Sequence, residues 1–163
     1  MASNKLKSGL IGEFPLVPLA DVNRVSQREY TFTVPAIVAA ATPIVERCLF
    51  VARRPCMITD VNGMSQAAIT ANDTNYFTIT ANKRTAAAPA TAVGFLAALL
   101  KLTGGTGSWV AFTKKALSGS FDATDTKRIL TTGDAVWVTY THSGTGLQIE
   151  VQTLTFEVEE LSD

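Results

Sequence analysis

The chain has 163 residues, a length that suits one folded domain with enough residues to close a substantial hydrophobic core. Hydrophobic residues make up 47% and charged residues 17%, which is fewer charges than the roughly 25% usual in soluble domains. The formal net charge is zero, and a charge-balanced surface favours association. Because nucleic-acid-binding proteins normally carry a basic excess, this composition argues against a nucleic-acid partner.

No charged segment followed by an apolar one opens the chain, so no secretory signal peptide is predicted. The longest apolar run, residues 92–100, is shorter than the about 20 residues that a membrane-spanning helix needs. We therefore expect a protein that is made in the cytoplasm and is not inserted into a membrane.

Residues 1–28 predict an extended N-terminal arm. Prolines and glycines interrupt single apolar residues, so no helical or strand period is sustained. Pro15 and Pro18 fix an extended backbone and remove hydrogen-bond donors. The arm nevertheless carries side chains that favour burial, namely Leu10, Ile11, Phe14, Leu16, Val17 and Leu19. These side chains have two possible places, on the arm's own domain or on a neighbouring subunit.

Residues 29–163 predict one β-domain. In YTFTVP, Phe32 and Val34 share one face, and Pro35 ends the strand. Strands are also predicted at 44–52 and 56–61, joined by an Arg-Arg-Pro corner, and in DTNYFTITANKR, which precedes a loop of small residues. Cys48 and Cys56 flank the corner, where a hairpin would let them face each other. Their apolar surroundings favour buried free thiols instead.

GFLAALLKLTGG is compatible with a short helix capped by Gly104 or with a buried strand, and its β-rich surroundings favour the strand. KRILTTGDAVWVTYT then leads into a predicted terminal hairpin. We count roughly eight strands and no long amphipathic helix. The predicted fold class is therefore all-β, an antiparallel β-sandwich or jelly-roll-like domain behind the extended arm.

The last predicted strand changes its buried face in mid-run. Leu147, Ile149 and Val151 occupy odd positions, whereas Leu154, Phe156 and Val158 occupy even ones, although a strand alternates with period 2. A β-bulge near residues 152–153 would restore one face. A crossing to the second sheet at a corner would also produce the change, and so would a contact between subunits, which makes residues 152–160 a candidate seam.

The chemistry-bearing residues do not form a catalytic pattern. A single histidine, His142 beside a turn, rules out multi-histidine metal sites. TGGTGS at 103–108 lacks the GK[ST] that follows in a phosphate-binding loop. Carboxylates for glycosidase chemistry or calcium would be Asp122, Asp125, Glu157, Glu159 and Glu160, but a solvated polar face explains the last strand's glutamates. We expect no enzyme, metal or cofactor.

The succession of NYFTIT, LLKLTGGTGS, ALSGSFDATDTKRI and LTTGDAVWVTYTHSGTG resembles the small β-sandwich virion proteins of tailed bacteriophages. The clearest match is the Gly133-Asp134 turn that introduces AVWVTYT, and the resemblance spans about residues 45–158. It implies a decoration or cement protein on the outside of an icosahedral capsid, commonly a trimer, whose partners are the major capsid protein and further copies of itself.

On this hypothesis the arm contacts a subunit or the shell through Phe14, Leu16, Val17 and Leu19, and Lys5, Lys7, Arg24 and Arg28 face an acidic shell surface. Leu154, Phe156 and Val158 would form the subunit seam. Two alternatives remain open. One is a head-fibre, tail or collar component. The other is a carbohydrate-binding β-sandwich in which Trp109, Trp137 or Tyr140 stacks on sugar rings.

Overall fold

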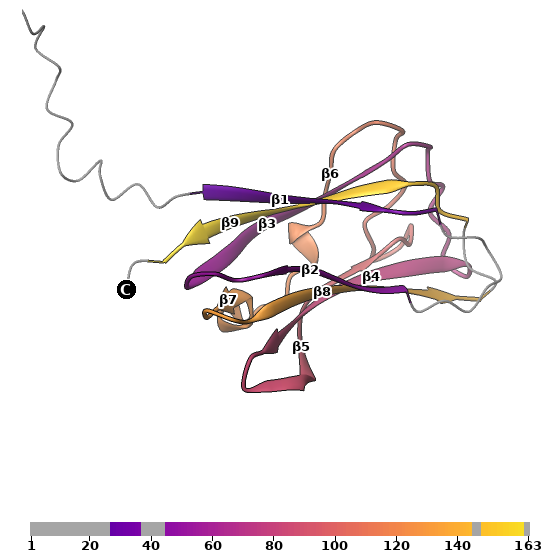
Figure 1. Cartoon of the computed structure of the whole chain (residues 1–163). Coiled ribbons are helices and arrows are strands. Elements are labelled where there is room, and N and C mark those ends of the chain that lie inside the picture. Colours follow the sequence, from indigo (N-terminus) through magenta and orange to yellow (C-terminus); the bar gives the residue numbers. More distant parts are fainter. Residues whose placement is uncertain (1–26, 37–44, 145–147, 162–163) are drawn as a thin grey trace, which may run out of the picture.

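The computed structural model describes residues 27–36, 45–144 and 148–161, which form two antiparallel sheets packed face to face (Figure 1). Within that part of the chain the only helical elements are two short 3-10 turns. In chain order the elements are β1 (Gln27–Val34), β2 (Val45–Val51), β3 (Cys56–Ser65), β4 (Tyr76–Thr85), β5 (Ala88–Leu99), β6 (Lys115–Ala116), η1 (Ser118–Ser120), η2 (Asp125–Arg128), β7 (Ile129–Leu130), β8 (Ala135–Ser143) and β9 (Gln152–Glu160).

The strand order is that of a jelly roll. One sheet has the order β1-β9-β3-β6, with β7 also paired to β3, and the other has the order β2-β8-β4-β5. The pairs are nested, because β1 pairs with β9, β2 with β8, β3 with β6 and β4 with β5. This set of pairs arises when the two halves of the chain run antiparallel as one long ribbon and the ribbon then folds over into two sheets. The all-β fold and the sandwich expected from the sequence are confirmed.

Alternating apolar residues build the core between the sheets. The period of 2 sends every second side chain inward, and the two inner faces interdigitate. These inward side chains are Phe77, Ile79 and Ala81 on β4, Val136, Val138 and Tyr140 on β8, and Leu154, Phe156 and Val158 on β9. Burial of each large one stabilises the fold by about 1.5–3 kcal/mol.

The first half of the ambiguous segment GFLAALLKLTGG, up to Leu99, forms a strand, as its surroundings favoured. It lies in β5, where Ala81 pairs with Leu96 but Asn82 pairs with Gly94, so Phe95 is an extra residue in a β-bulge. Phe95 and Leu96 are consecutive and both buried, and Leu96 also bridges to Phe121. The bulge interrupts the period of 2, which is why the pattern alone did not distinguish strand from helix.

The predicted terminal hairpin is wrong, because β8 and β9 lie in different sheets. β9 begins at Gln152 and pairs with β1 up to Glu159 without a register shift, so no bulge lies near residues 152–153. Ile149, before the strand, is buried in the core. The change of buried face therefore marks the crossing from one sheet to the other, and Leu147 lies outside the described residues.

The Arg-Arg-Pro corner also passes between sheets, since β2 and β3 do not pair. Both cysteines are free thiols, as expected, but only Cys56 is buried, whereas Cys48 is exposed on β2. Desolvation raises the pKa of the Cys48 thiol, and the nearby Arg84 opposes this shift. Cys48 keeps exposed surface because β2 is the outermost strand of its sheet.

Candidate interaction surface

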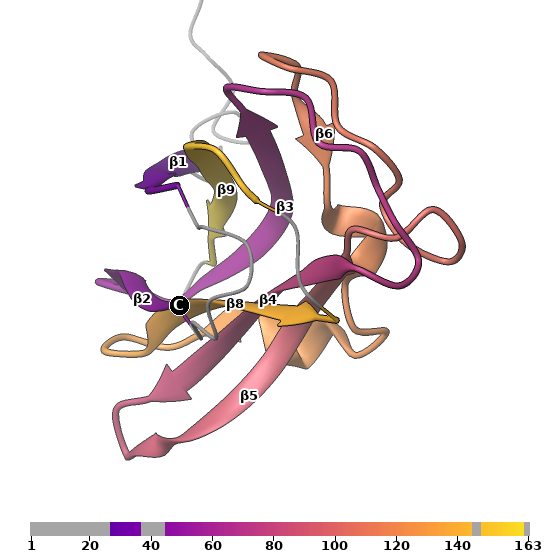
Figure 2. The ribbon, with the colours of Figure 1, turned by 90° about the vertical axis from the view of Figure 1, so that its right-hand side faces the viewer.

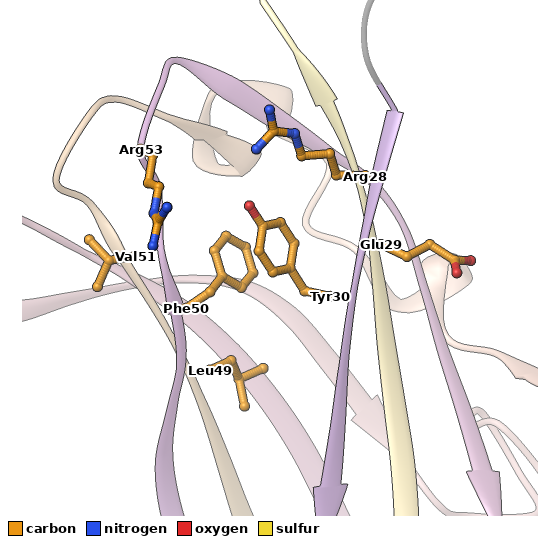
Figure 3. A pocket seen from close by; sticks show the side chains of 7 residues that line it. All are labelled: Arg28, Glu29, Tyr30, Leu49, Phe50, Val51 and Arg53. Atoms are coloured by element: carbon orange, nitrogen blue, oxygen red, sulfur yellow. The ribbon is translucent and has the colours of Figure 1, made fainter.

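A groove separates the outermost strands of the two sheets. β1 ends one sheet and β2 ends the other, and Figure 2 shows both on the same side of the sandwich. The groove has a volume of about 690 Å³ and opens to solvent (Figure 3). Its walls are Arg28, Glu29 and Tyr30 of β1, Leu49, Phe50 and Val51 of β2, and Arg53 of the corner.

The alternation of side chains along β1 explains which of its residues line the groove. Even-numbered residues face inward, and their burial deepens along the strand from exposed Arg28, through partly buried Tyr30 and Phe32, to Val34 in the core. Tyr30 and Arg28 therefore belong to the inner face but lie where the two sheets diverge. The strand presents an aromatic ring and a guanidinium at the open end of the sandwich.

A β-bulge in β2 builds the opposite wall. Cys48 pairs with Trp137 and Phe50 with Val136, so Leu49 is the inserted residue. An inserted residue bends an edge strand and redirects its side chains. As a result the neighbours Leu49 and Phe50 both line the groove.

Tyr30 and Phe50 connect the two sheets across their unpaired edges. Their rings stack with centroids 4.1 Å apart and an interplanar angle of 9° (Figure 3). Phe50 in turn meets Phe156 of the core edge-on, with centroids 6.5 Å apart. The floor of the groove is thus an aromatic surface fixed to the core, which an incoming apolar side chain can contact without rearranging the fold.

The rim of the groove is cationic. A smaller hollow of about 240 Å³ adjoins the groove and shares Arg28, Tyr30 and Arg53 with it, adding Arg54 and Glu160. Glu160 lies 2.7 Å from the Arg28 guanidinium and 3.9 Å from that of Arg54.

One carboxylate therefore faces three arginines at this rim. Among the described residues no carboxylate forms an ion pair with Arg53. The side chain of Glu29 points away from the stacked rings (Figure 3). The combination of an apolar floor and a cationic rim suits an apolar ligand that carries negative charge.

The adjoining hollow also contains the buried thiol of Cys56. Desolvation, followed by the charges of Glu160 and Asp134, raises the pKa of this thiol, and Arg28 opposes the shift. A neutral thiol is a weak nucleophile, so Cys56 contributes packing at this site and not reactivity.

Among the described residues that were predicted to form an interface, Arg28 lines the groove and Val158 lines the adjoining hollow. The subunit seam expected at Leu154, Phe156 and Val158 needs correction, because these side chains are at most 2% exposed in the chain's own core. They are buried because β9 lies between β1 and β3 and turns these residues toward the opposite sheet. The remaining interface predictions, Phe14, Leu16, Val17, Leu19 and Arg24, lie outside the described residues.

The rest of the groove was not predicted from the sequence. Tyr30 has the same parity as Phe32 and Val34, and that parity was the available signal for an inward aromatic ring on β1. The run Leu49-Phe50-Val51 has no such signal, because the bulge interrupts its period. Arg53 and Arg54 belong to the predicted corner, but the pattern did not place that corner beside β1.

Four of the five carboxylates considered for catalysis or calcium binding have basic partners. Glu157 pairs with Lys114, Asp122 with Lys127, Asp125 with Arg128, and Glu160 with Arg28. Hydrogen bonds from Lys127 and then from Thr124 hold the pKa of Asp122 below its usual range. Within the described ranges, no three side chains among His, Cys, Asp and Glu are grouped so that they could hold a metal ion.

The aromatic residues considered for sugar stacking are mostly enclosed. Trp109 and Tyr140 are 2% and 3% exposed, and burial raises the pKa of Tyr140. The Tyr140 hydroxyl donates a hydrogen bond to Gln152 Oε1 at 3.2 Å. Trp137 is half-buried, and the guanidinium of Arg84 covers one face of its ring at 4.7 Å.

Neither the protein-family models nor the curated proteins that were compared with the chain contain a match to it. In the described part of the chain, no helix has the length and apolar character needed to cross a membrane. The strand order defines the fold class as a jelly-roll β-sandwich, and the groove between β1 and β2 is its candidate interaction surface.

Proposed function

We propose that the protein is a structural virion component that binds the outside of a bacteriophage capsid and stabilises it, as a trimer. The observation that carries this proposal is the open groove between two unpaired sheet edges, at the point where the N-terminal arm leaves β1. Such a groove suits the binding of another polypeptide, and its described lining residues include no pair of groups placed for general acid–base catalysis. The resemblance to tailed-phage virion proteins supplies the capsid as the partner.

The physical properties of the chain suit a layer of repeated contacts. A charge-balanced surface with few charges tolerates close packing between protein surfaces. A capsid repeats the same binding position many times, and a trimer engages several positions at once. Each contact then needs only modest affinity, because avidity retains the bound trimer.

Co-sedimentation with expanded empty phage heads tests this function. The full chain should sediment with the heads up to a fixed number of copies per particle and should raise the temperature at which the heads disrupt. Bovine serum albumin at the same concentration is the control for trapping. Absence of binding to the heads would overturn the capsid function.

A truncated chain lacking residues 1–26 tests the arm separately. The truncation keeps β1 whole, so we expect it to fold and to lose binding to the heads. Full occupancy by the truncated chain would remove the arm from the proposal and leave the capsid function in place.

A second candidate is a capsid subunit that forms the shell itself. The nested strand order favours it, because the jelly roll is a common architecture of viral shell proteins, although a fold alone does not define a function. Electron microscopy of the purified chain distinguishes the two candidates. A shell protein assembles into closed particles without preformed heads, whereas a decoration protein does not.

A carbohydrate-binding function has less support, since Trp109 and Tyr140 have almost no exposed surface for a sugar ring. Trp137 is the residue left for it. Binding on a glycan array that is lost in Trp137→Ala would favour this alternative over the capsid function.

A further inference from the structure

We infer that the groove between β1 and β2 is the docking site for the N-terminal arm of a second copy of this chain. The segment that docks is residues 13–21, EFPLVPLAD, which we call the arm segment. The inference concerns the purified protein alone and does not depend on the capsid function.

The chemistry of the arm segment complements that of the groove. Its centre, Phe14 to Leu19, is entirely apolar or proline, and such a segment docks in extended form on aromatic-lined grooves. The stacked rings of Tyr30 and Phe50 provide that aromatic floor. Beside it, the side chain of Val51 is 50% exposed on the edge of β2, which leaves apolar surface uncovered.

The charges also match. The arm segment begins with Glu13, ends with Asp21 and contains no basic residue. The rim presents Arg28, Arg53 and Arg54 against the carboxylate of Glu160, while the carboxylate of Glu29 points away from the stacked rings (Figure 3). The acidic residues at both ends of the extended segment are attracted to this cationic rim, which favours docking in the groove.

The connection to β1 favours the groove of another copy over the chain's own. To fill its own groove, the chain must reverse direction within residues 22–26, VNRVS. Apart from Asn23 and Ser26 this stretch has no residue type that favours tight turns, and its two valines favour an extended backbone. An extended connection from Asp21 to Gln27 spans at most about 20–22 Å, so the accepting groove belongs to a directly adjacent copy.

Such a contact is head-to-tail. Each copy offers one arm and one groove, and these are different surfaces of the molecule. Contacts of this kind generate a closed ring when the rotation between copies closes. Arm exchange therefore gives a route to a cyclic oligomer.

The test uses three full-length variants and the molar mass in solution, measured by sedimentation equilibrium. The groove variant is Val51→Glu with Arg53→Glu, two exposed positions outside the core. The arm variant is Leu16→Asp with Val17→Asp. The matched control is Val110→Glu with Arg47→Glu, which makes the same chemical change at exposed positions that do not line the groove.

We expect the unaltered chain and the control to be oligomers, and the groove and arm variants to be monomers at the same concentration. An equimolar mixture of the two monomeric variants should form a heterodimer, because the mixture restores one intact arm and one intact groove. Circular dichroism of each variant checks that the fold is retained.

Three outcomes would overturn the inference. They are a monomeric unaltered chain, an oligomer that survives both pairs of substitutions, and a mixture that stays monomeric. A monomeric unaltered chain in which Leu16→Asp with Val17→Asp lowers the unfolding temperature would indicate that the arm occupies its own groove.

Discussion

Gly63 shows how one residue can decide the packing at one end of the sandwich. The Trp109 ring lies directly on its backbone, and a Cβ atom built on Gly63 would be 2.2 Å from Trp109 Cη2. Trp109 is held there by reciprocal backbone hydrogen bonds with Ile69 and by an indole N–H donated to Thr106. Glycine in a strand commonly marks such a close approach, and any other residue would displace the ring.

We expect Gly63→Ala to lower the free energy of unfolding by about 1–3 kcal/mol, the usual cost of overpacking a core. Urea denaturation monitored by tryptophan fluorescence measures this change. Gly94→Ala is the matched control, because it also lies in a strand but a Cβ there has no neighbour within 4 Å. Equal effects of the two substitutions would contradict the role assigned to the Gly63–Trp109 contact.

At the scale of elements, β9 supports the sheet that carries β1. It pairs with β1 on one side and with β3 on the other over almost its whole length. A strand with two neighbours has no free main-chain donors along its edges, whereas β1, β2 and β5 each have one open edge. β5 accordingly tolerates Pro89 in its exposed part, as edge strands do.

We expect Thr155→Pro to reduce the free energy of unfolding by at least about 2 kcal/mol. Thr155 pairs with Thr31 and with Asn62, so proline removes a ladder donor and leaves an acceptor unsatisfied. Equilibrium unfolding in urea provides the measurement. The control is Ala90→Pro, an exposed position between the paired residues Ala88 and Ala92 of β5, where the change should stay within about 0.5 kcal/mol. A Thr155→Pro variant as stable as this control would be incompatible with the central position of β9.

For the whole molecule, the jelly-roll order makes nearly every pairing long-range in sequence. Gln27 pairs with Glu159, so the two ends of the described chain meet in one sheet. The wall of the groove requires β1 beside the corner that follows β2, and β1 is itself held by β9. The groove therefore forms only when the whole ribbon has folded, and not from any local segment.

We expect the domain to refold in milliseconds to seconds, the range of β-sandwiches dominated by non-local pairs. Stopped-flow fluorescence after dilution from urea gives the rate. A double jump that leaves the prolines in their native isomers separates this phase from proline isomerisation, which takes tens of seconds. Completion of folding within microseconds would be inconsistent with a transition state that must bring β1 and β9 together.

The sequence alone was sufficient to predict local features. The alternation in YTFTV, NYFTITA and AVWVTYT predicted strands and their inward faces, because the period of 2 depends only on neighbouring residues. The Gly133-Asp134 turn was expected from the resemblance to tailed-phage virion proteins, and Gly133 has a positive φ of 92°, which glycine adopts without strain. From these elements the all-β class followed.

Only the tertiary structure decided which strands meet. The sequence pattern did not reveal that β8 and β9 belong to different sheets, or that Leu154, Phe156 and Val158 face the chain's own core. The sequence analysis named Arg28 as a candidate interface residue. It did not predict the stacking of Tyr30 on Phe50, because that contact joins two strands that are not hydrogen-bonded to each other. The physical reason is that alternation records whether a side chain is buried, whereas pairing depends on the free energy of the whole packed ribbon.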